Sequence, residues 1–551
     1  MIVERAVAIP MRDGTVLRAD VYRPEAGAPV PAIVSRTCYD RSFPLTPPAA
    51  IDPDRAVQEG FALVCQDVRG RFESEGEFYP FASEGSDGYD TIEWLAVRPW
   101  CSGAIGMAGR SYPAAAQWIA AGTRPPHLRA ISPTVIGSDA YNGWVYQGGA
   151  FSLGFNLFWV SLMSKGKPRP ALQQQFKHLP LGEAPLLAEN PTARFYHDWL
   201  AHPTADGYWR EFSPRRLHQS VAVPAFNVGG WYDVFLGGTL ENFMRMRREA
   251  DGEAARDGTR LVVGPWIHGS AYGGYPDHSF ALFGSESKLD LDGLQLQFFG
   301  RWLRGDPAPA DDPMVRIFVM GLNRWRCEAD WPLARARPER WYLRAGGRLS
   351  RSAPGADEAP SDEYVYDPAD AAPTIGGPTS LPAKFMRTNS GPLDQRPLEG
   401  RTDVLVYSSE PTKRAVEVTG PLSVVLHAAT SAPDTDFVAK LCDVDPDGFS
   451  RIVAEGVLRA RFRQGFERAR PIARDTPYEY RIDLVATSNV FLAGHQIVVI
   501  VTSSSFPRFD RNANSGKHLG ADREEDLSAA RQTIFHDLSR PSHIVLPVVP
   551  G

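Results

Sequence analysis

The stretch Ala104–Ile119, AIGMAGRSYPAAAQWI, decides the fold of this chain. Its first four residues predict a short buried strand, and Pro113 with the alanines that follow predicts the start of a helix. Proline fits the first helical turn because its missing N–H would have no intrahelical partner there. Only Gly109–Tyr112 remain for the connection, which is too short for an ordinary loop. The chain must therefore turn sharply at Ser111.

A strand that turns this sharply into a helix holds its central residue in a strained conformation, with the side chain exposed at the top of the sheet. This is the nucleophile elbow of α/β-hydrolases, which usually reads G-x-S-x-G. Pro113 stands at the second glycine, and an ordinary turn between strand and helix is the alternative interpretation. The N–H after the nucleophile, that of Tyr112, is retained, and the helix N-terminus favours a developing negative charge. The stretch therefore predicts a nucleophilic Ser111.

The composition indicates a globular protein with more than one domain. The chain has 551 residues, of which 43% are hydrophobic and 23% charged, and its net charge of −6 offers no basic face to nucleic acid. We find no signal peptide and no apolar run long enough to span a membrane. Five cysteines without paired spacing favour a reducing compartment. We expect a cytoplasmic protein that binds neither nucleic acid nor membranes, and a homo-oligomer remains open.

Apolar strands that alternate with helices surround the elbow and predict a parallel sheet covered on both faces, after an opening hairpin over residues 5–23. An aromatic-rich helical stretch interrupts this pattern, and many short strands, beginning with Arg316–Met320, follow it. The Pro- and Ala-rich residues 353–375 predict a surface loop. The predicted fold is an α/β-hydrolase domain with an inserted helical cap, followed by a C-terminal all-β jelly-roll domain. The predicted parts are the hydrolase domain at 1–138 and 221–312, the cap at 139–220, and the jelly roll at 313–551.

Two later strands end in residues that suit a catalytic triad. One apolar strand, starting at Phe226, ends with Asp233, and the next, starting at Leu261, ends with His268. The triad of α/β-hydrolases follows the chain order Ser, Asp or Glu, His, and open α/β sheets build their sites at carboxyl ends of strands. Taken alone, Asp233 suits a turn or helix cap, and His268 suits a loop histidine bound to a backbone carbonyl. Order and position together predict that both residues join Ser111.

One acidic segment imitates the start of a calcium-binding loop. Asp443, Asp445 and Asp447 have the spacing of an EF-hand, but Ala454 stands where the bidentate carboxylate is needed. Strand-like runs flank the segment, so we predict a hairpin turn. Histidines and cysteines show no ligand spacing either, and we expect neither a metal nor a cofactor.

Motifs over nearly the whole chain resemble the X-Pro dipeptidyl-peptidase and cocaine esterase-like family of α/β-hydrolases. They are Tyr39-Asp40, Gln66–Gly76, Trp100–Gly103, Gly109–Tyr112, Gly230–Asp233, Gly264–His268 and Gly391–Pro397. The family's nucleophile motif reads G-x-S-Y-x-G, and Ala114 replaces its last glycine here. The resemblance implies that Ser111 is the nucleophile, His268 the general base and Asp233 its orienting carboxylate. It also implies an oxyanion hole made by the main-chain N–H of Tyr112 and the hydroxyl of Tyr39.

The same resemblance implies an aromatic pocket for the acyl group of the substrate. The matching positions are Trp144, Trp159 and Phe235, with Phe385 and Met386 closing the pocket from the C-terminal domain. Such a pocket suits a bulky or aromatic acyl group. Relatives that hydrolyse α-amino-acid esters bind the substrate amine through carboxylates, which should fall near residues 141–144. Only Asp139 lies close to that position here.

We therefore expect a serine carboxylesterase that cleaves esters with an apolar or aromatic acyl group through an acyl-enzyme. Its expected partner is a small-molecule ester or amide. The same triad also suits hydrolysis of amides or peptides, or transfer of the acyl group to an amine or alcohol. A non-catalytic ligand-binding protein is the third alternative, because jelly rolls often bind carbohydrate. The serine, aspartate, histidine and tyrosine at four separate motifs argue against it.

Overall fold

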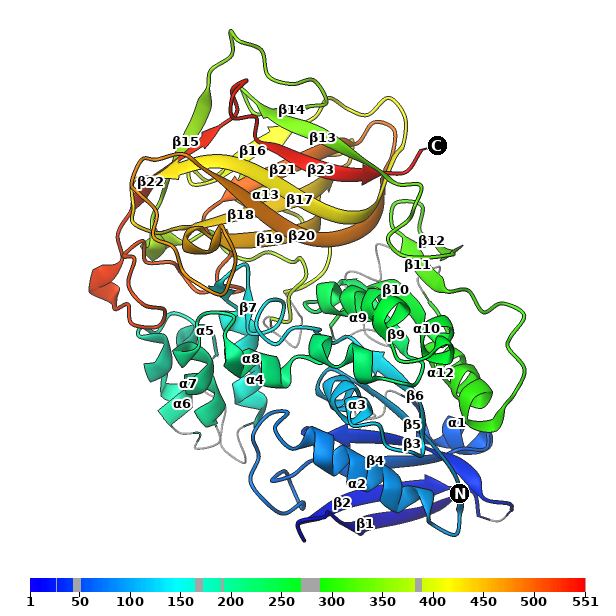
Figure 1. The fold of residues 1–551 in the computed structure, drawn as a ribbon. Helices are drawn as coiled ribbons and strands as arrows, with labels where there is room; N and C mark the ends of the chain where they lie inside the picture. The colour runs from blue at the N-terminus through cyan, green and yellow to red at the C-terminus, as the bar shows by residue number, and fades with distance from the viewer. Residues whose placement is uncertain are drawn as a thin grey trace.

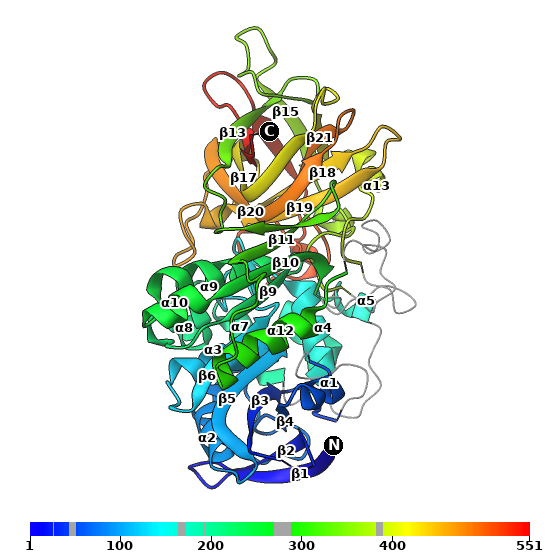
Figure 2. The same ribbon diagram turned by 90° about the vertical axis from the view of Figure 1, so that its right-hand side faces the viewer.

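A computed structural model describes the chain in two main parts, an α/β part and an all-β part (Figure 1). The described residues are 1–25, 27–42, 51–163, 172–188, 190, 193–268, 288–381 and 389–550. Figure 2 shows the all-β part stacked on the end of the α/β part that carries β9–β12, with the helices of the α/β part on both sides of its sheet.

A ten-stranded sheet forms the centre of the α/β part, in the order β1-β2-β4-β3-β5-β6-β9-β10-β11-β12. Strands β4 to β11 in that order run parallel, whereas β1, β2 and β12 are antiparallel additions at the two edges. The predicted parallel sheet and opening hairpin are therefore confirmed. The strands are β1 (Ile2–Pro10), β2 (Val16–Arg23), β3 (Val30–Thr37), β4 (Ala62–Asp67), β5 (Cys101–Arg110), β6 (Leu128–Thr134), β9 (Phe226–Tyr232), β10 (Arg260–Ile267), β11 (Val315–Val319) and β12 (Arg324–Glu328).

Helices cover both faces of this sheet because its strands are apolar on both sides. On β3, Ala32 and Val34 join the core that includes α2 and α3, whereas Ile33 between them joins the core with α1 and α12. This alternation follows from the two-residue period of a strand. The helices are α1 (Pro53–Gln58), α2 (Glu84–Ala96), α3 (Tyr112–Gly122), α9 (Leu236–Glu249), α10 (Glu253–Gly258) and α12 (Leu291–Phe299).

The stretch predicted as a cap contains short helices and one small hairpin. The helices are α4 (Leu153–Met163), α5 (Leu172–Gln175), α6 (Pro185–Ala188), α7 (Arg194–Ala201) and α8 (Gly207–Phe212), and the hairpin pairs β7 (Tyr146–Gln147) with β8 (Ala150–Phe151). Helix α4 is buried almost all round, as expected for a helix between two layers. The helices of this stretch agree with the sequence pattern, while the boundaries of the cap at residues 139 and 220 remain predictions.

The all-β part is an eleven-stranded arrangement in which the long strand β17 pairs with β20, β22 and β23. Its own apolar core lies between these strands. An α/β-hydrolase domain followed by a β-rich domain is thus confirmed. The strands are β13 (Arg337–Arg344), β14 (Arg348–Ser350), β15 (Ser361–Tyr366), β16 (Leu405–Ser408), β17 (Val416–Thr430), β18 (Asp436–Val444), β19 (Ser450–Arg459), β20 (Tyr478–Phe491), β21 (Gln496–Thr502), β22 (Ala530–Phe535) and β23 (His543–Val548).

Two sequence-based assignments are wrong. The strand at Arg316–Met320 belongs to the first sheet, because β11 pairs in parallel with β10, with Leu261 opposite Val315. The run of short strands after residue 313 does not reveal which sheet each strand joins. The expected surface loop at 353–375 contains β15, an edge strand that pairs with β22. Alternating burial over Ser361–Tyr366 is the strand signal that the surrounding prolines and alanines obscured.

The acidic segment forms the predicted hairpin turn between β18 and β19. One carboxylate oxygen of Asp445 accepts hydrogen bonds from the main-chain N–H groups of Asp447 and Phe449, both at 3.0 Å. Within the described ranges, no three His, Cys, Asp or Glu side chains are grouped so that they could hold a metal ion. The described helices include none that is long and apolar enough to cross a membrane.

Buried charges join the all-β part to the small hairpin β7–β8. Asp510 accepts a hydrogen bond from the main-chain N–H of Phe151 at 2.8 Å, and Arg508 donates one to Gln147 at 2.9 Å. Arg508 also pairs with the buried Glu455, which lies 2.7 Å from Lys440 Nζ. Burial alone would raise the pKa of Glu455, but the two cations outweigh it and lower this pKa to about 2. The ionised network therefore fixes the start of the helical stretch above the sheet.

Candidate active site

Ser111 is the single residue between β5 and α3. Its backbone has φ 60° and ψ −123°, a conformation that a residue with a Cβ atom rarely adopts. The Ser111 N–H donates to the carbonyl of Thr134 at 2.9 Å, which ties the turn to β6. The predicted strained turn is confirmed. Ser111, whose side chain we expected to be exposed, is only 8% exposed.

Three side chains form a hydrogen-bonded chain at the carboxyl ends of β5, β9 and β10. His268 Nε2 lies 3.1 Å from Ser111 Oγ, and His268 Nδ1 lies 2.8 Å from Asp233 Oδ2. The other carboxylate oxygen of the buried Asp233 accepts a hydrogen bond from the main-chain N–H of Phe235 at 2.6 Å. In this arrangement, the histidine can accept a proton from the serine while the aspartate fixes its tautomer.

Further residues hold His268 in place, and the sequence analysis assigned this role to none of them. Arg110, next to the serine, donates a hydrogen bond to the main-chain carbonyl of His268 at 2.7 Å. The imidazole also meets the edges or faces of two phenylalanine rings, with centroid distances of 5.2 Å to Phe235 and 6.2 Å to Phe155. Arg110 had a sequence signal, since it adjoins the predicted nucleophile. Phe155 had only the helical spacing of an ordinary core residue.

Tyr39 follows β3 and reaches the serine from the opposite side. Its hydroxyl oxygen accepts a hydrogen bond from Trp159 Nε1 at 2.9 Å. Burial raises the pKa of Tyr39 above its usual value, and the neighbouring Ser111 and Trp159 side chains only partly oppose this. The phenol therefore keeps its proton at neutral pH and is available as a donor.

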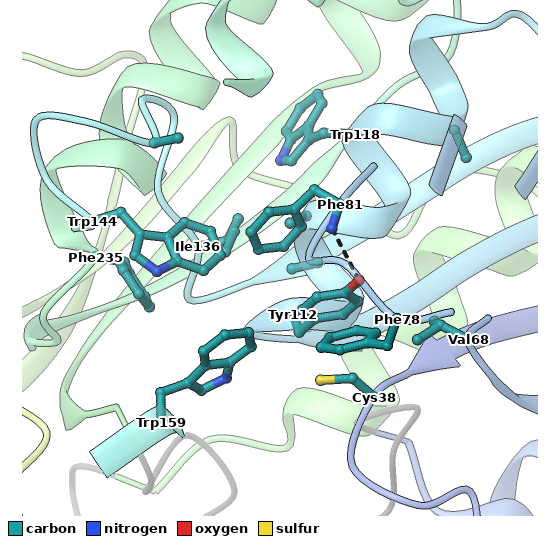
Figure 3. Packing of buried hydrophobic residues seen from close by; sticks show 14 of the residues in the cluster. Cys38, Val68, Phe78, Phe81, Tyr112, Trp118, Ile136, Trp144, Trp159 and Phe235 are labelled. Carbon is teal, nitrogen blue, oxygen red and sulfur yellow. Dashed lines mark hydrogen bonds between the residues drawn. The ribbon is translucent and has the colours of Figure 1, made fainter. Parts of the chain in front are cut away.

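Tyr112 contributes its main chain and its side chain in different ways. Its N–H lies at the first position of α3, where a helix supplies no carbonyl partner, so it is suited to bind an anion beside Ser111. Its buried side chain points away from the serine: the hydroxyl donates to Glu84 at 2.9 Å and accepts from the main-chain N–H of Phe81 at 3.2 Å (Figure 3). These contacts anchor the turn in the core.

Aromatic side chains gather beside this site. Figure 3 shows Trp144, Phe235 and Trp159 close to Tyr112 and Phe81. The ring centroids of Trp144 and Phe235 are 4.9 Å apart, and those of Trp159 and Tyr112 are 6.4 Å apart. The ring centroid of Phe81 lies 4.8 Å from those of both Trp144 and Tyr112. No sequence pattern pointed to Phe81, because it follows a glycine- and glutamate-rich loop. Three residues expected to line the pocket thus lie together.

The remaining residues considered for substrate binding are Phe385, Met386 and Asp139. Phe385 and Met386 lie outside the described residues. Asp139 is the carboxylate that the sequence places near the expected amine-binding position. It forms an ion pair with Arg215 at 2.7 Å, and it accepts a hydrogen bond from the main-chain N–H of Tyr141 at 2.9 Å. Both of its oxygens are therefore occupied within the protein.

Comparisons with known proteins agree with this geometry. Residues 13–270 match the family model described as X-Pro dipeptidyl-peptidase (S15 family), and residues 308–545 match the X-Pro dipeptidyl-peptidase C-terminal non-catalytic domain. The chain is 39% identical to the cocaine esterase of Rhodococcus sp. (strain MB1 Bresler) over 575 residues, which cover 98% of both proteins.

Two solved structures extend the comparison to the whole fold. An aminopeptidase from the marine sediment archaeon Thaumarchaeota archaeon has a TM-score of 0.86 at 27% identity, covering 100% of this chain and 97% of its own. An α-amino acid ester hydrolase has a TM-score of 0.85 at 26% identity, covering 99% and 96%. The chain therefore belongs to the X-Pro dipeptidyl-peptidase family of α/β-hydrolases, together with the cocaine esterase-like enzymes.

Proposed function

We propose that this protein is a serine esterase that hydrolyses carboxylic esters through a covalent acyl-enzyme. The observation that carries the proposal is the hydrogen-bonded chain from Ser111 Oγ through His268 to Asp233, with distances of 3.1 and 2.8 Å. The serine lies in a strained turn at a helix N-terminus, where the fold presents a nucleophile and an anion-binding N–H together.

Acylation begins when Ser111 Oγ attacks the carbonyl carbon of the ester. His268 Nε2 takes the hydroxyl proton, and Asp233 stabilises the resulting imidazolium through its Nδ1–H. The carbonyl oxygen becomes an oxyanion, which accepts hydrogen bonds from the Tyr39 hydroxyl and the Tyr112 main-chain N–H. When the tetrahedral intermediate collapses, His268 returns the proton to the departing alcohol, and the acyl group stays on Ser111.

Deacylation repeats these steps with water in place of the serine. His268 removes a proton from the water as its oxygen attacks the acyl carbon. The same two donors stabilise the second oxyanion, and Ser111 Oγ leaves with the proton from His268. The products are an alcohol and a carboxylic acid, and the resting enzyme is restored.

The acyl group that we propose is apolar or aromatic. Trp144, Trp159 and Phe235 lie beside the triad and offer ring surfaces to such a group. The relative with 39% identity is a cocaine esterase by name, which agrees with an ester of a bulky acid. Asp139 forms an ion pair with Arg215, so its carboxylate is already engaged and does not serve as a binding group for a substrate amine.

A panel of activated aryl, alkyl, amino-acid and peptide substrates tests this function. We expect turnover of aryl and alkyl esters, and labelling of Ser111 by a fluorophosphonate probe. Turnover confined to amides or peptides would favour the alternative peptidase. Products that form only when an acceptor is added, an amide with an amine or a new ester with an alcohol, would favour an acyltransferase. An active enzyme that the probe does not label would overturn the serine mechanism.

We further propose that the enzyme works on small molecules in the cytoplasm. The five cysteines, all within the described residues, form no disulfide, and four of them are buried, as expected for a protein from a reducing compartment. Size-exclusion chromatography with light scattering tests the homo-oligomer that the sequence leaves open.

A further inference from the structure

We propose that Trp159 is a positioning residue of the oxyanion hole, and that its indole N–H sets the direction and strength of the Tyr39 hydroxyl as a donor. This inference rests on the proposed esterase mechanism and gives Trp159 a role beyond its aromatic surface. The observation behind it is the hydrogen bond of 2.9 Å from Trp159 Nε1 to the Tyr39 hydroxyl oxygen.

The packing around Trp159 leaves its ring little freedom. The residue lies on α4 and is only 3% exposed. Its ring stacks on Trp199 at a centroid distance of 5.9 Å and meets the edge of Phe195 at 5.2 Å. On the other side, it lies parallel to Tyr112 at 6.4 Å. The direction of the indole N–H is therefore fixed by the core of the helical stretch.

The chemistry of the two groups determines which of them donates. An indole nitrogen can only donate, whereas a phenol has one O–H donor and an oxygen that accepts. Trp159 must therefore donate to Tyr39, and the single proton of Tyr39 points elsewhere. This hydroxyl has the Ser111 side chain as a neighbour, and the substrate's carbonyl oxygen becomes the oxyanion beside that side chain.

The Ser111 hydroxyl completes this chain of donors. Ser111 Oγ donates to His268 Nε2 before attack, so its oxygen can accept the Tyr39 proton. Because Trp159 donates to Tyr39, the O–H of Tyr39 remains for the oxyanion that forms when Ser111 attacks. Donation into the phenol oxygen also polarises its O–H and strengthens it as a donor.

Loss of the indole N–H leaves the Tyr39 hydroxyl free to rotate between two in-plane directions. Only one of these directions serves the oxyanion. Trp159 comes from α4, Tyr39 from the loop after β3, and Ser111 from the elbow, so these three elements must meet before the oxyanion hole is complete. The helical stretch therefore takes part in transition-state stabilisation and does not only cover the site.

A double-mutant cycle with Trp159→Phe and Tyr39→Phe tests this role. An activated acetate ester is the substrate, because its small acyl group makes little use of the aromatic surface. We expect Trp159→Phe to lower kcat about 3- to 10-fold with little change in KM, which is the usual value of one hydrogen bond. In the Tyr39→Phe background, the same substitution should change kcat by less than about 2-fold, because the group it acts through is gone. Equal losses in both backgrounds, or a change in KM alone, would overturn the inference.

Three further variants keep the test decisive. Trp144→Phe removes another indole N–H from the same aromatic group, and its effect should add to that of Tyr39→Phe without coupling. If Trp159→Phe fails to fold, site-specific 3-benzothienylalanine at position 159 keeps the ring shape and replaces N–H with sulfur, and its kcat decides the question.

Ser111→Ala separates the two proposals. An active Ser111→Ala variant refutes the esterase mechanism. An inactive variant, together with uncoupled effects of the Trp159 and Tyr39 substitutions, refutes only the role of Trp159.

Discussion

The substitution Asp233→Asn replaces one oxygen of the triad with an NH₂ group and keeps the size of the side chain. In the native protein, both carboxylate oxygens accept a hydrogen bond, one from the Phe235 N–H at 2.6 Å and one from His268 Nδ1 at 2.8 Å. An amide has only one oxygen. If that oxygen keeps the bond to Phe235, the NH₂ group faces His268 Nδ1 and forces this nitrogen to become an acceptor.

The structure indicates which orientation the asparagine takes. The opposite orientation would direct its NH₂ group at the Phe235 N–H and leave buried donors unpaired, at a cost of about 1–3 kcal/mol. In the preferred orientation, the proton of His268 moves to Nε2 and faces Ser111, so the histidine cannot accept the serine proton. We expect kcat/KM to fall about 10⁴-fold, which corresponds to about 5 kcal/mol of transition-state stabilisation.

Steady-state hydrolysis of an activated ester near neutral pH measures this loss, and a thermal melt confirms that the variant is folded. Asp445→Asn is the matched control, because Asp445 makes the same kind of side-chain to main-chain bonds in the hairpin turn between β18 and β19. That control should retain normal turnover. If a folded Asp233→Asn variant loses less than about 10-fold in kcat/KM, the assignment of Asp233 as the orienting carboxylate is refuted.

Four further predictions follow from the same geometry. Ser111→Ala should abolish ester hydrolysis and leave the melting temperature nearly unchanged, and normal turnover would exclude it as the nucleophile. Tyr39→Phe should lower kcat about 10²–10³-fold with little change in KM, and near-normal kcat would remove Tyr39 from the oxyanion hole. Dialysis against EDTA should not reduce activity, whereas a loss that a divalent ion restores would reveal a metal. The folded pKa of Glu455 is lowered from 4.5 to about 2, so its contribution to stability is present above pH 4.5 and is lost as the pH falls toward 2. Glu455→Gln should flatten that acid limb in unfolding experiments and lower the free energy of unfolding at pH 7 by about 3–5 kcal/mol, because two buried cations lose their partner; an unchanged acid limb would contradict this.

Local patterns in the sequence were sufficient to predict the elbow and the strands around it. The strained conformation of Ser111 follows from the short connection between a strand and a helix that begins with Pro113. Asp233 and His268 end two strands that lie side by side, so parallel pairing alone brings them to the same edge of the sheet. Chain order, strand ends and short motifs are local features, and a single sequence carries them directly.

Contacts between distant segments required the tertiary structure. The short strand β11 has the composition of a sandwich strand, and only its pairing with β10 assigns it to the first sheet. The edge strand β15 is recognised by its partner β22, since prolines and alanines surround it. Many pairings satisfy the same pattern of apolar residues, and the competition among them is decided by the packing of the whole chain.

The sequence by itself determined the sharp turn at Ser111 and the two strand ends that bring Asp233 and His268 to the same edge of the sheet, and the family resemblance predicted the aromatic residues near them. Only the tertiary structure decided that the Trp159 N–H is used by Tyr39, that Arg110 holds the carbonyl of His268, and that Phe81 joins the aromatic group. The physical reason is directional. Residue type specifies which groups can donate or pack, whereas the direction in which a fixed side chain points depends on the packing of segments far apart in the chain.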